Sequence, residues 1–78
     1  MTPLFRIKNL EEGKTVVYAI EADEKGEFIL TYYTLSDGQP QDIRRTRYKT
    51  LQDIRSALSP NRYPTHQIIV DFIEVKKT

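Results

Sequence analysis

Apolar side chains recur at every second position in three N-terminal segments, residues 4–8, 15–22 and 27–35. This is the period of a strand that buries one of its faces, so each segment is predicted to be a strand. Residues 9–13 are expected to form a turn after the first, a short edge strand. Asp23-Glu24-Lys25-Gly26 is expected to join the other two as a hairpin, with Gly26 free to adopt a positive φ. The alternating rows are Phe5 and Ile7, then Val16, Tyr18 and Ile20, then Phe28, Leu30 and Tyr32.

A fourth strand and a helix follow. Asp37-Gly38 is a second hairpin signal, but Pro40 removes a backbone donor and residues 43–48 are mostly polar, so a strand there would be an exposed edge. Thr50 is a helix N-cap candidate with Asp53 three residues later, and Leu51, Ile54 and Leu58 would share one helix face. Ser59-Pro60 ends this helix.

Residues 66–75 are predicted to form a last strand, and apolar side chains occupy both of its faces. Ile68, Val70 and Phe72 take one face, whereas the opposite face carries Ile69, Ile73 and Val75. One short helix covers only one face of a sheet, so something else should cover the other. The alternatives are closure of the sheet on itself, partial exposure, or contact with a protein partner or a second copy of the chain. The residues predicted to bind such a partner are Ile69, Ile73, Val75 and Tyr33.

These elements predict an α+β fold in a single domain, residues 1–78. The expected order is β-β-β-(β)-α-β, a small antiparallel sheet of four to five strands with one helix. The alternative is a partly closed small β-barrel with one helix. The predicted core is Phe5, Ile7, Val16, Tyr18, Ile20, Phe28, Leu30, Leu51, Ile54, Leu58, Ile68, Val70 and Phe72.

The composition points to a reducing compartment and to two oppositely charged parts of the chain. There is no cysteine and no long apolar run, which favours a cytoplasmic protein that does not interact with a membrane. Residues 1–42 hold 4 Lys/Arg against 8 Asp/Glu, and residues 43–78 hold 8 against 3. The net charge of +1 conceals this asymmetry.

The basic part suggests nucleic acid as an alternative partner, because guanidinium groups suit phosphates and tyrosines stack on bases. The competing interpretations are a charged edge strand that blocks aggregation and a surface for an acidic protein partner. Three strands before a helix that begins near Tyr48-Lys49-Thr50 resemble two groups of three-stranded DNA-binding domains in topology, over residues 15–58. These are the domains of AP2 type and those at integrase N-termini. The first two of those strands are here acidic and apolar, where such domains carry base-reading arginines. The candidate nucleic-acid-binding residues are Arg44, Arg45, Arg47, Lys49, Arg55, Arg62, Tyr48 and Tyr63.

No motif indicates catalysis, a metal or a cofactor. Gly13-Lys14-Thr15 ends like a phosphate-binding loop, but Lys8 stands where that motif needs its first glycine, and a strand follows instead of a helix. His66 is the only histidine and is expected to be a solvated side chain. The sequence therefore predicts no enzyme, no small-molecule substrate and no cofactor. It favours a regulatory or adaptor module that binds a protein partner or itself through a sheet face and the C-terminal strand, with nucleic acid as the alternative.

Overall fold

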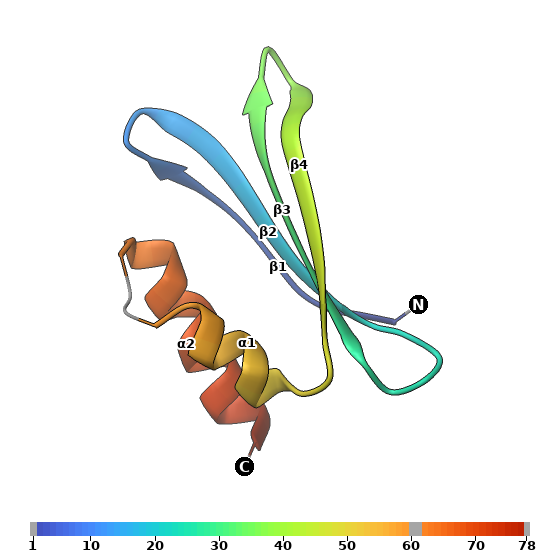
Figure 1. The fold of residues 1–78 in the computed structure, drawn as a ribbon. Helices are drawn as coiled ribbons and strands as arrows, with labels where there is room; N and C mark the ends of the chain where they lie inside the picture. The colour runs from blue at the N-terminus through green and yellow to red at the C-terminus, as the bar shows by residue number, and fades with distance from the viewer. Residues whose placement is uncertain (1, 60–61, 78) are drawn as a thin grey trace.

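The computed structural model describes residues 2–59 and 62–77, which form one antiparallel sheet and two helices. The sheet order is β1-β2-β3-β4, so every strand pairs with its neighbour in sequence (Figure 1). The α+β antiparallel sheet is thus confirmed, but the sheet is open, which makes the barrel alternative wrong. The elements are β1 (Thr2–Glu11), β2 (Lys14–Ala22), β3 (Phe28–Ser36), β4 (Gln39–Tyr48), α1 (Leu51–Ala57) and α2 (Pro64–Lys77).

Two tight turns set the strand lengths. Glu12 and Gly13 have φ values of 51° and 81°, and Asp37 and Gly38 have 51° and 77°. Two consecutive positive φ angles are typical of the type I′ turn, whose twist matches that of the hairpin it closes. The hairpin at Asp37-Gly38 is confirmed. Because the turn at Glu12-Gly13 needs only two residues, β1 is longer than the predicted segment and runs to Glu11.

The connection between β2 and β3 is the predicted hairpin, and Gly26 has the expected positive φ, 83°. The Asp23 carboxylate accepts hydrogen bonds from the backbone amides of Lys25 and Glu27, each 2.9 Å long. An aspartate that accepts from amides just after it stabilises a turn locally. This loop is therefore held by its own side chain.

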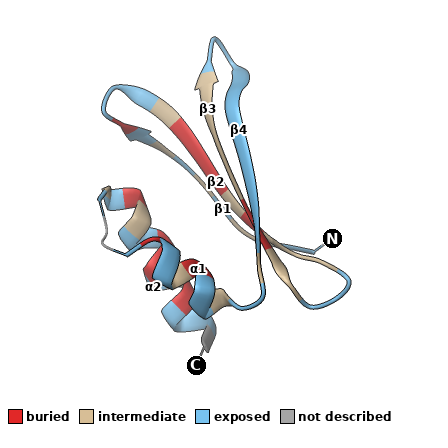
Figure 2. Cartoon of the chain, in the orientation of Figure 1, coloured by how far each residue is buried: buried red, intermediate tan, exposed pale blue. Residues whose placement is uncertain are grey.

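Strand β4 is the exposed edge that the sequence predicts, and Figure 2 shows it pale blue along nearly its whole length. Arg44 lies opposite Tyr32 and Gln41 opposite Thr34, so two residues, Asp42 and Ile43, face Tyr33. This is a β-bulge, and Asp42 has a positive φ of 53° within it. A bulge on an edge strand hinders pairing with another chain.

Helix α1 begins as predicted. The Thr50 side chain accepts a hydrogen bond of 3.1 Å from the Asp53 amide, which is the N-cap arrangement. The helix has only 7 residues, and Ile54 is its buried residue. Such a short helix is not stable alone, so its contact with the sheet must stabilise it.

The prediction of a last strand at residues 66–75 is wrong, because these residues lie in α2. Ile69 and Ile73 are four residues apart and fall on one side of a helix, where both are 0% exposed. Ile68 and Val75 lie outside, 41% and 73% exposed. A short apolar run does not distinguish a strand from a buried helix. Pro64 is the first residue of α2, a position where proline is favoured.

Both helices lie on the same face of the sheet (Figure 1), and the core fills the space between the two layers. The rings of Phe5 and Phe72 meet there with their centroids 4.6 Å apart. Of the predicted core residues, all but Ile68 are buried or pack against the core. The buried cluster consists of Val16, Tyr18, Ile20, Leu30, Ile54, Leu58, Ile69, Val70 and Ile73.

Candidate functional site

The face of the sheet opposite the helices is the first candidate surface, and we call it the open face. Strand register places Arg6, Ala19, Thr31 and Arg45 in one row across all four strands. This row has a guanidinium at each end and small side chains in the middle. The adjacent rows hold Lys8, Val17 and Tyr33 on one side and Glu21, Ile29 and Arg47 on the other. Beyond Tyr33 the open face continues with an uncharged row, Leu10, Thr15, Leu35 and Pro40.

The middle of the open face is apolar but is not bare. Val17 is 0% exposed and Ile29 is 6% exposed, although no helix covers them. Lys8 and Tyr33 flank Val17, and Arg47 lies beside Ile29. Long polar side chains shield apolar neighbours with their hydrocarbon stems while their charged ends stay in water. The open face is therefore a thin apolar strip with cationic borders.

One of these cations is already paired. The Arg47 guanidinium contacts the Asp23 carboxylate, and a Glu27 oxygen lies 3.6 Å from it. Desolvation by itself would raise the pKa of Asp23, but the amides of Glu27 and Lys25 and the charge of Arg47 outweigh it and lower that pKa. Arg47 thus stabilises the β2–β3 turn, which leaves Arg6, Lys8 and Arg45 as the exposed cations of the open face with no described ion pair.

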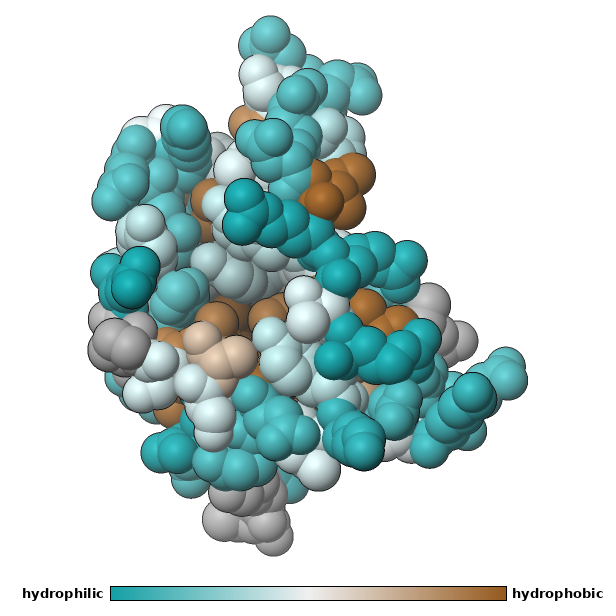
Figure 3. Space-filling view, in the orientation of Figure 1, coloured by the Kyte–Doolittle hydropathy of each residue, from teal (hydrophilic) through white to brown (hydrophobic). Residues whose placement is uncertain are grey.

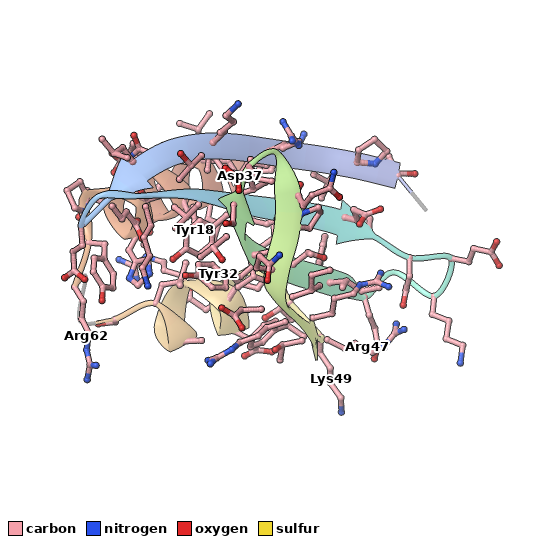
Figure 4. The ribbon with its side chains drawn as sticks, turned by 90° about the horizontal axis from the view of Figure 1, so that it is seen from above. Tyr18, Tyr32, Asp37, Arg47, Lys49 and Arg62 are labelled. Carbon is pink, nitrogen blue, oxygen red and sulfur yellow. The ribbon has the colours of Figure 1, made fainter. Side chains whose placement is uncertain are left out.

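The structure does not bring the predicted nucleic-acid-binding residues together. Arg45 and Arg47 lie on the open face, whereas Arg44 lies on the helix side. Figure 4 shows Arg62 at one end of the molecule, well apart from Lys49 and Arg47. The remaining members have other contacts: Arg55 pairs with Glu74, Tyr48 packs against the core, and Tyr63 lines a pocket.

Sequence reasoning missed Arg6 and Lys8 as members of a cationic surface. They alternate with Phe5 and Ile7, so the period of the strand places them on the open face once those two residues are assigned to the core. The signal was present in the first strand. The cationic surface is not visible in the charge along the chain, because Arg6 and Lys8 join Arg45 only through the pairing of the strands.

The predicted partner-binding residues are also separated. Ile69 and Ile73 are part of the core, so they are not available to a partner. Tyr33 lies on the open face, and Val75 is exposed on α2, which covers the opposite face of the sheet. The four residues therefore form no common surface.

A second candidate lies on the helix side of the sheet, where the helices leave part of β3 and β4 uncovered. We call it the tyrosine pocket, a cavity of about 500 Å³ walled by Tyr18, Tyr32 and Tyr63, with Glu11 among its lining residues. Its volume falls within the range of about 300–1,000 Å³ found for small-molecule sites. Charged residues of both signs also line it, namely Glu12, Lys14, Asp42 and Arg44. The space-filling view shows the two hairpin tips standing apart, with the surface hollowed beneath them (Figure 3).

The aromatic rings of the pocket hold one another in place. The Tyr18 and Tyr32 centroids are 4.9 Å apart, and both side chains lie between the sheet and the helices in Figure 4. His66 packs edge-on against Tyr18 and Tyr63, at 5.7 and 5.3 Å, and its Nε2 shares a hydrogen bond of 3.0 Å with the Tyr18 hydroxyl. His66 was expected to be solvated, but it is a half-buried member of this cluster.

Glu11 is the unusual residue of the pocket. It is 8% exposed, and its Oε2 atom has no hydrogen-bond partner within the described residues. Burial raises the pKa of Tyr18 well above its usual range, and the Glu11 charge adds to this effect. The pKa of Tyr32 is raised in the same way, first by burial and then by Glu11. The pocket interior therefore disfavours further negative charge.

Comparisons with protein-family models, curated proteins and solved structures found no match. Function must be inferred from the two surfaces themselves. Within residues 2–59 and 62–77, no cluster of three or more His, Cys, Asp or Glu side chains could hold a metal ion. Over the same residues, neither helix has the length and apolarity needed to cross a membrane.

The lowered pKa of His66 predicts that folding stability depends on pH. Burial lowers the pKa of His66, the nearby Arg62 lowers it further, and Glu11 opposes this shift. The unfolded histidine, with a pKa of about 6.5, takes up protons that the folded histidine does not, so folding stability should decrease as the pH falls from about 7.5 through 6.5. Thermal unfolding midpoints between pH 7.5 and 5.5 should show this slope, and His66→Gln should flatten it. An unchanged slope in the variant would assign the pH dependence to other groups.

Proposed function

We propose that this chain is a non-catalytic module that binds a nucleic acid duplex with the open face of its sheet. The observation that carries the proposal is the row Arg6, Ala19, Thr31 and Arg45, which places a cation on each outer strand and small residues between them. Phosphate contacts made by arginine and lysine supply most of the affinity of nucleic-acid-binding proteins.

The spacing supports a duplex in particular. Strands in a sheet lie about 4.8 Å apart, so β1 and β4 are separated by about 14 Å. The major groove of B-form DNA is about 12 Å wide, with a phosphate backbone on each side. Arg6 and Lys8 on β1 would meet one backbone and Arg45 on β4 the other, while Thr31 and Tyr33 face the groove.

A protein partner, including a second copy of the chain, is supported less well. A final strand with two apolar faces would need such a partner, but residues 66–75 lie in a helix whose inner residues are buried. Apart from Arg47, which is paired with Asp23 and Glu27, the described rows of the open face carry three cations and one carboxylate, Glu21. This charge suits a polyanion better than a copy with the same charges.

The test is duplex binding measured by fluorescence anisotropy as a function of salt. Affinity should fall linearly on a logarithmic plot, with a slope of about −0.9 per phosphate contact. The triple variant R6A/K8A/R45A should reduce the slope by about 2.7 for three lost contacts. The matched control is K25A/R62A/K76A, which removes the same charge from exposed positions away from the open face. Absence of binding at low salt, or equal losses in the two variants, would refute the proposal.

A further inference from the structure

We propose that the tyrosine pocket binds a small organic ammonium ion, with Glu11 as its counter-ion. The pocket lies on the helix side of the sheet, so this site is separate from the open face and does not depend on the function proposed for that face. Glu11 is 8% exposed and its Oε2 atom has no partner among the described residues, so it lacks a cation or a donor.

A buried charged oxygen without a partner costs free energy, and a ligand that supplies the missing charge recovers it. Glu11 comes from the last position of β1, directly before the tight turn at Glu12-Gly13. Its backbone is therefore fixed by the hairpin. The side chain is also buried, so little of it has to be ordered when a ligand arrives, which reduces the entropy that binding must overcome.

The walls of the pocket select the class of cation. Tyr18, Tyr32 and Tyr63 bring three aromatic rings to one cavity. The faces of aromatic rings attract cations, and methylated ammonium groups are recognised in this way because they are large and weakly hydrated. Calcium would instead require six to eight oxygen ligands, and the described residues hold no cluster that could supply them.

The remaining charges of the pocket do not oppose this ligand. Glu12 and Asp42 balance Lys14 and Arg44, and all four are exposed to solvent. Water and salt screen exposed charges strongly. The net field inside the cavity therefore comes mainly from the buried Glu11.

The test is an NMR titration of the whole chain with choline chloride at constant ionic strength, followed in ¹H–¹⁵N spectra. Saturable shifts should appear at Glu11, Tyr18, Tyr32 and Tyr63. The neutral compound 3,3-dimethyl-1-butanol has the shape of choline without its charge, and it should produce no such shifts. If choline causes no saturable change at these residues, or if the neutral compound binds equally well, the proposal is wrong.

Two variants separate the charge from the fold. Glu11→Gln keeps the size of the side chain and should weaken choline binding by about tenfold or more, as expected for the loss of a charged partner. Glu24→Gln removes the same charge from the exposed β2–β3 turn and should bind as the unaltered protein does. Equal affinities of these two variants would overturn the role of Glu11.

A second wall variant keeps the test valid if Glu11→Gln does not fold. Tyr63 lies outside the strands and helices, in the segment before α2. Tyr63→Leu replaces its aromatic face with a smaller aliphatic side chain. Choline binding should weaken severalfold in this variant because one cation–π contact is lost. Unchanged affinity in Tyr63→Leu would contradict the aromatic part of the site.

Discussion

Ile73→Glu should unfold the protein. Ile73 is 0% exposed and packs in the core from α2, so the variant would place a carboxylate in the buried apolar cluster. The penalty for such a buried, unpaired charge is several kcal/mol. A small domain has only about 5–15 kcal/mol of stability in total. Circular dichroism should show loss of the folded signal or a much lower unfolding midpoint.

Val75→Glu is the matched control, because it introduces the same charge on the same helix at a position that is 73% exposed. Its free energy of unfolding should stay within about 0.5 kcal/mol of the unaltered protein. A folded, monomeric Ile73→Glu protein would instead mean that this residue faces solvent or a partner. The position of α2 would then be wrong.

Ile54→Ala should lower the free energy of unfolding by about 2–5 kcal/mol. Ile54 is 0% exposed and is the buried residue of the 7-residue α1. The truncation creates a cavity and also weakens the attachment of a helix that is too short to persist without the sheet. Chemical denaturation followed by circular dichroism would measure the loss.

Ile43→Ala makes the identical substitution on β4 at a side chain that is 59% exposed. Its effect should be within about 0.5 kcal/mol, since the substitution is on the surface. If both variants lost the same stability, burial would not explain the effect. The assignment of α1 to the core would then lose its support.

The sheet could be predicted from sequence because local signals agreed with one another there. Alternating apolar rows marked β2 and β3, and Asp37-Gly38 marked the turn before β4. The N-cap at Thr50 likewise needed only residues close in sequence. Each of these features is determined by short-range chemistry.

The error at α2 has a physical cause. In residues 68–75 every position is apolar except Asp71 and Glu74, so the pattern fits a strand buried on both faces as well as a helix with a broad apolar side. The choice between strand and helix depends on the burial of Ile69 and Ile73. Both pack in one cluster with residues of β2 and β3, which are distant in sequence. Asn9, for example, donates a hydrogen bond of 2.8 Å to Thr65, 56 residues away.

The two candidate surfaces could not be predicted for the same reason. Arg6 and Arg45 are far apart in the chain and become ends of one row only through the pairing of four strands. Glu11, Tyr32 and Tyr63 meet only where the hairpins diverge beside α2. Sequence patterns identify which side chains of a strand or helix point to the core. Which side chains of different elements share a surface depends on the whole fold.

The order of elements also affects the chain while it is being synthesised. All four strands pair with sequence neighbours, so residues 2–48 can form the sheet before the helices that follow them exist. At about 5–20 residues per second, the ribosome needs a few seconds to add residues 49–77. During that interval the row Val16, Tyr18 and Ile20 has no cover. The nascent protein therefore exposes an apolar surface for longer than a hairpin takes to form. A chaperone that binds apolar segments would bind during that interval.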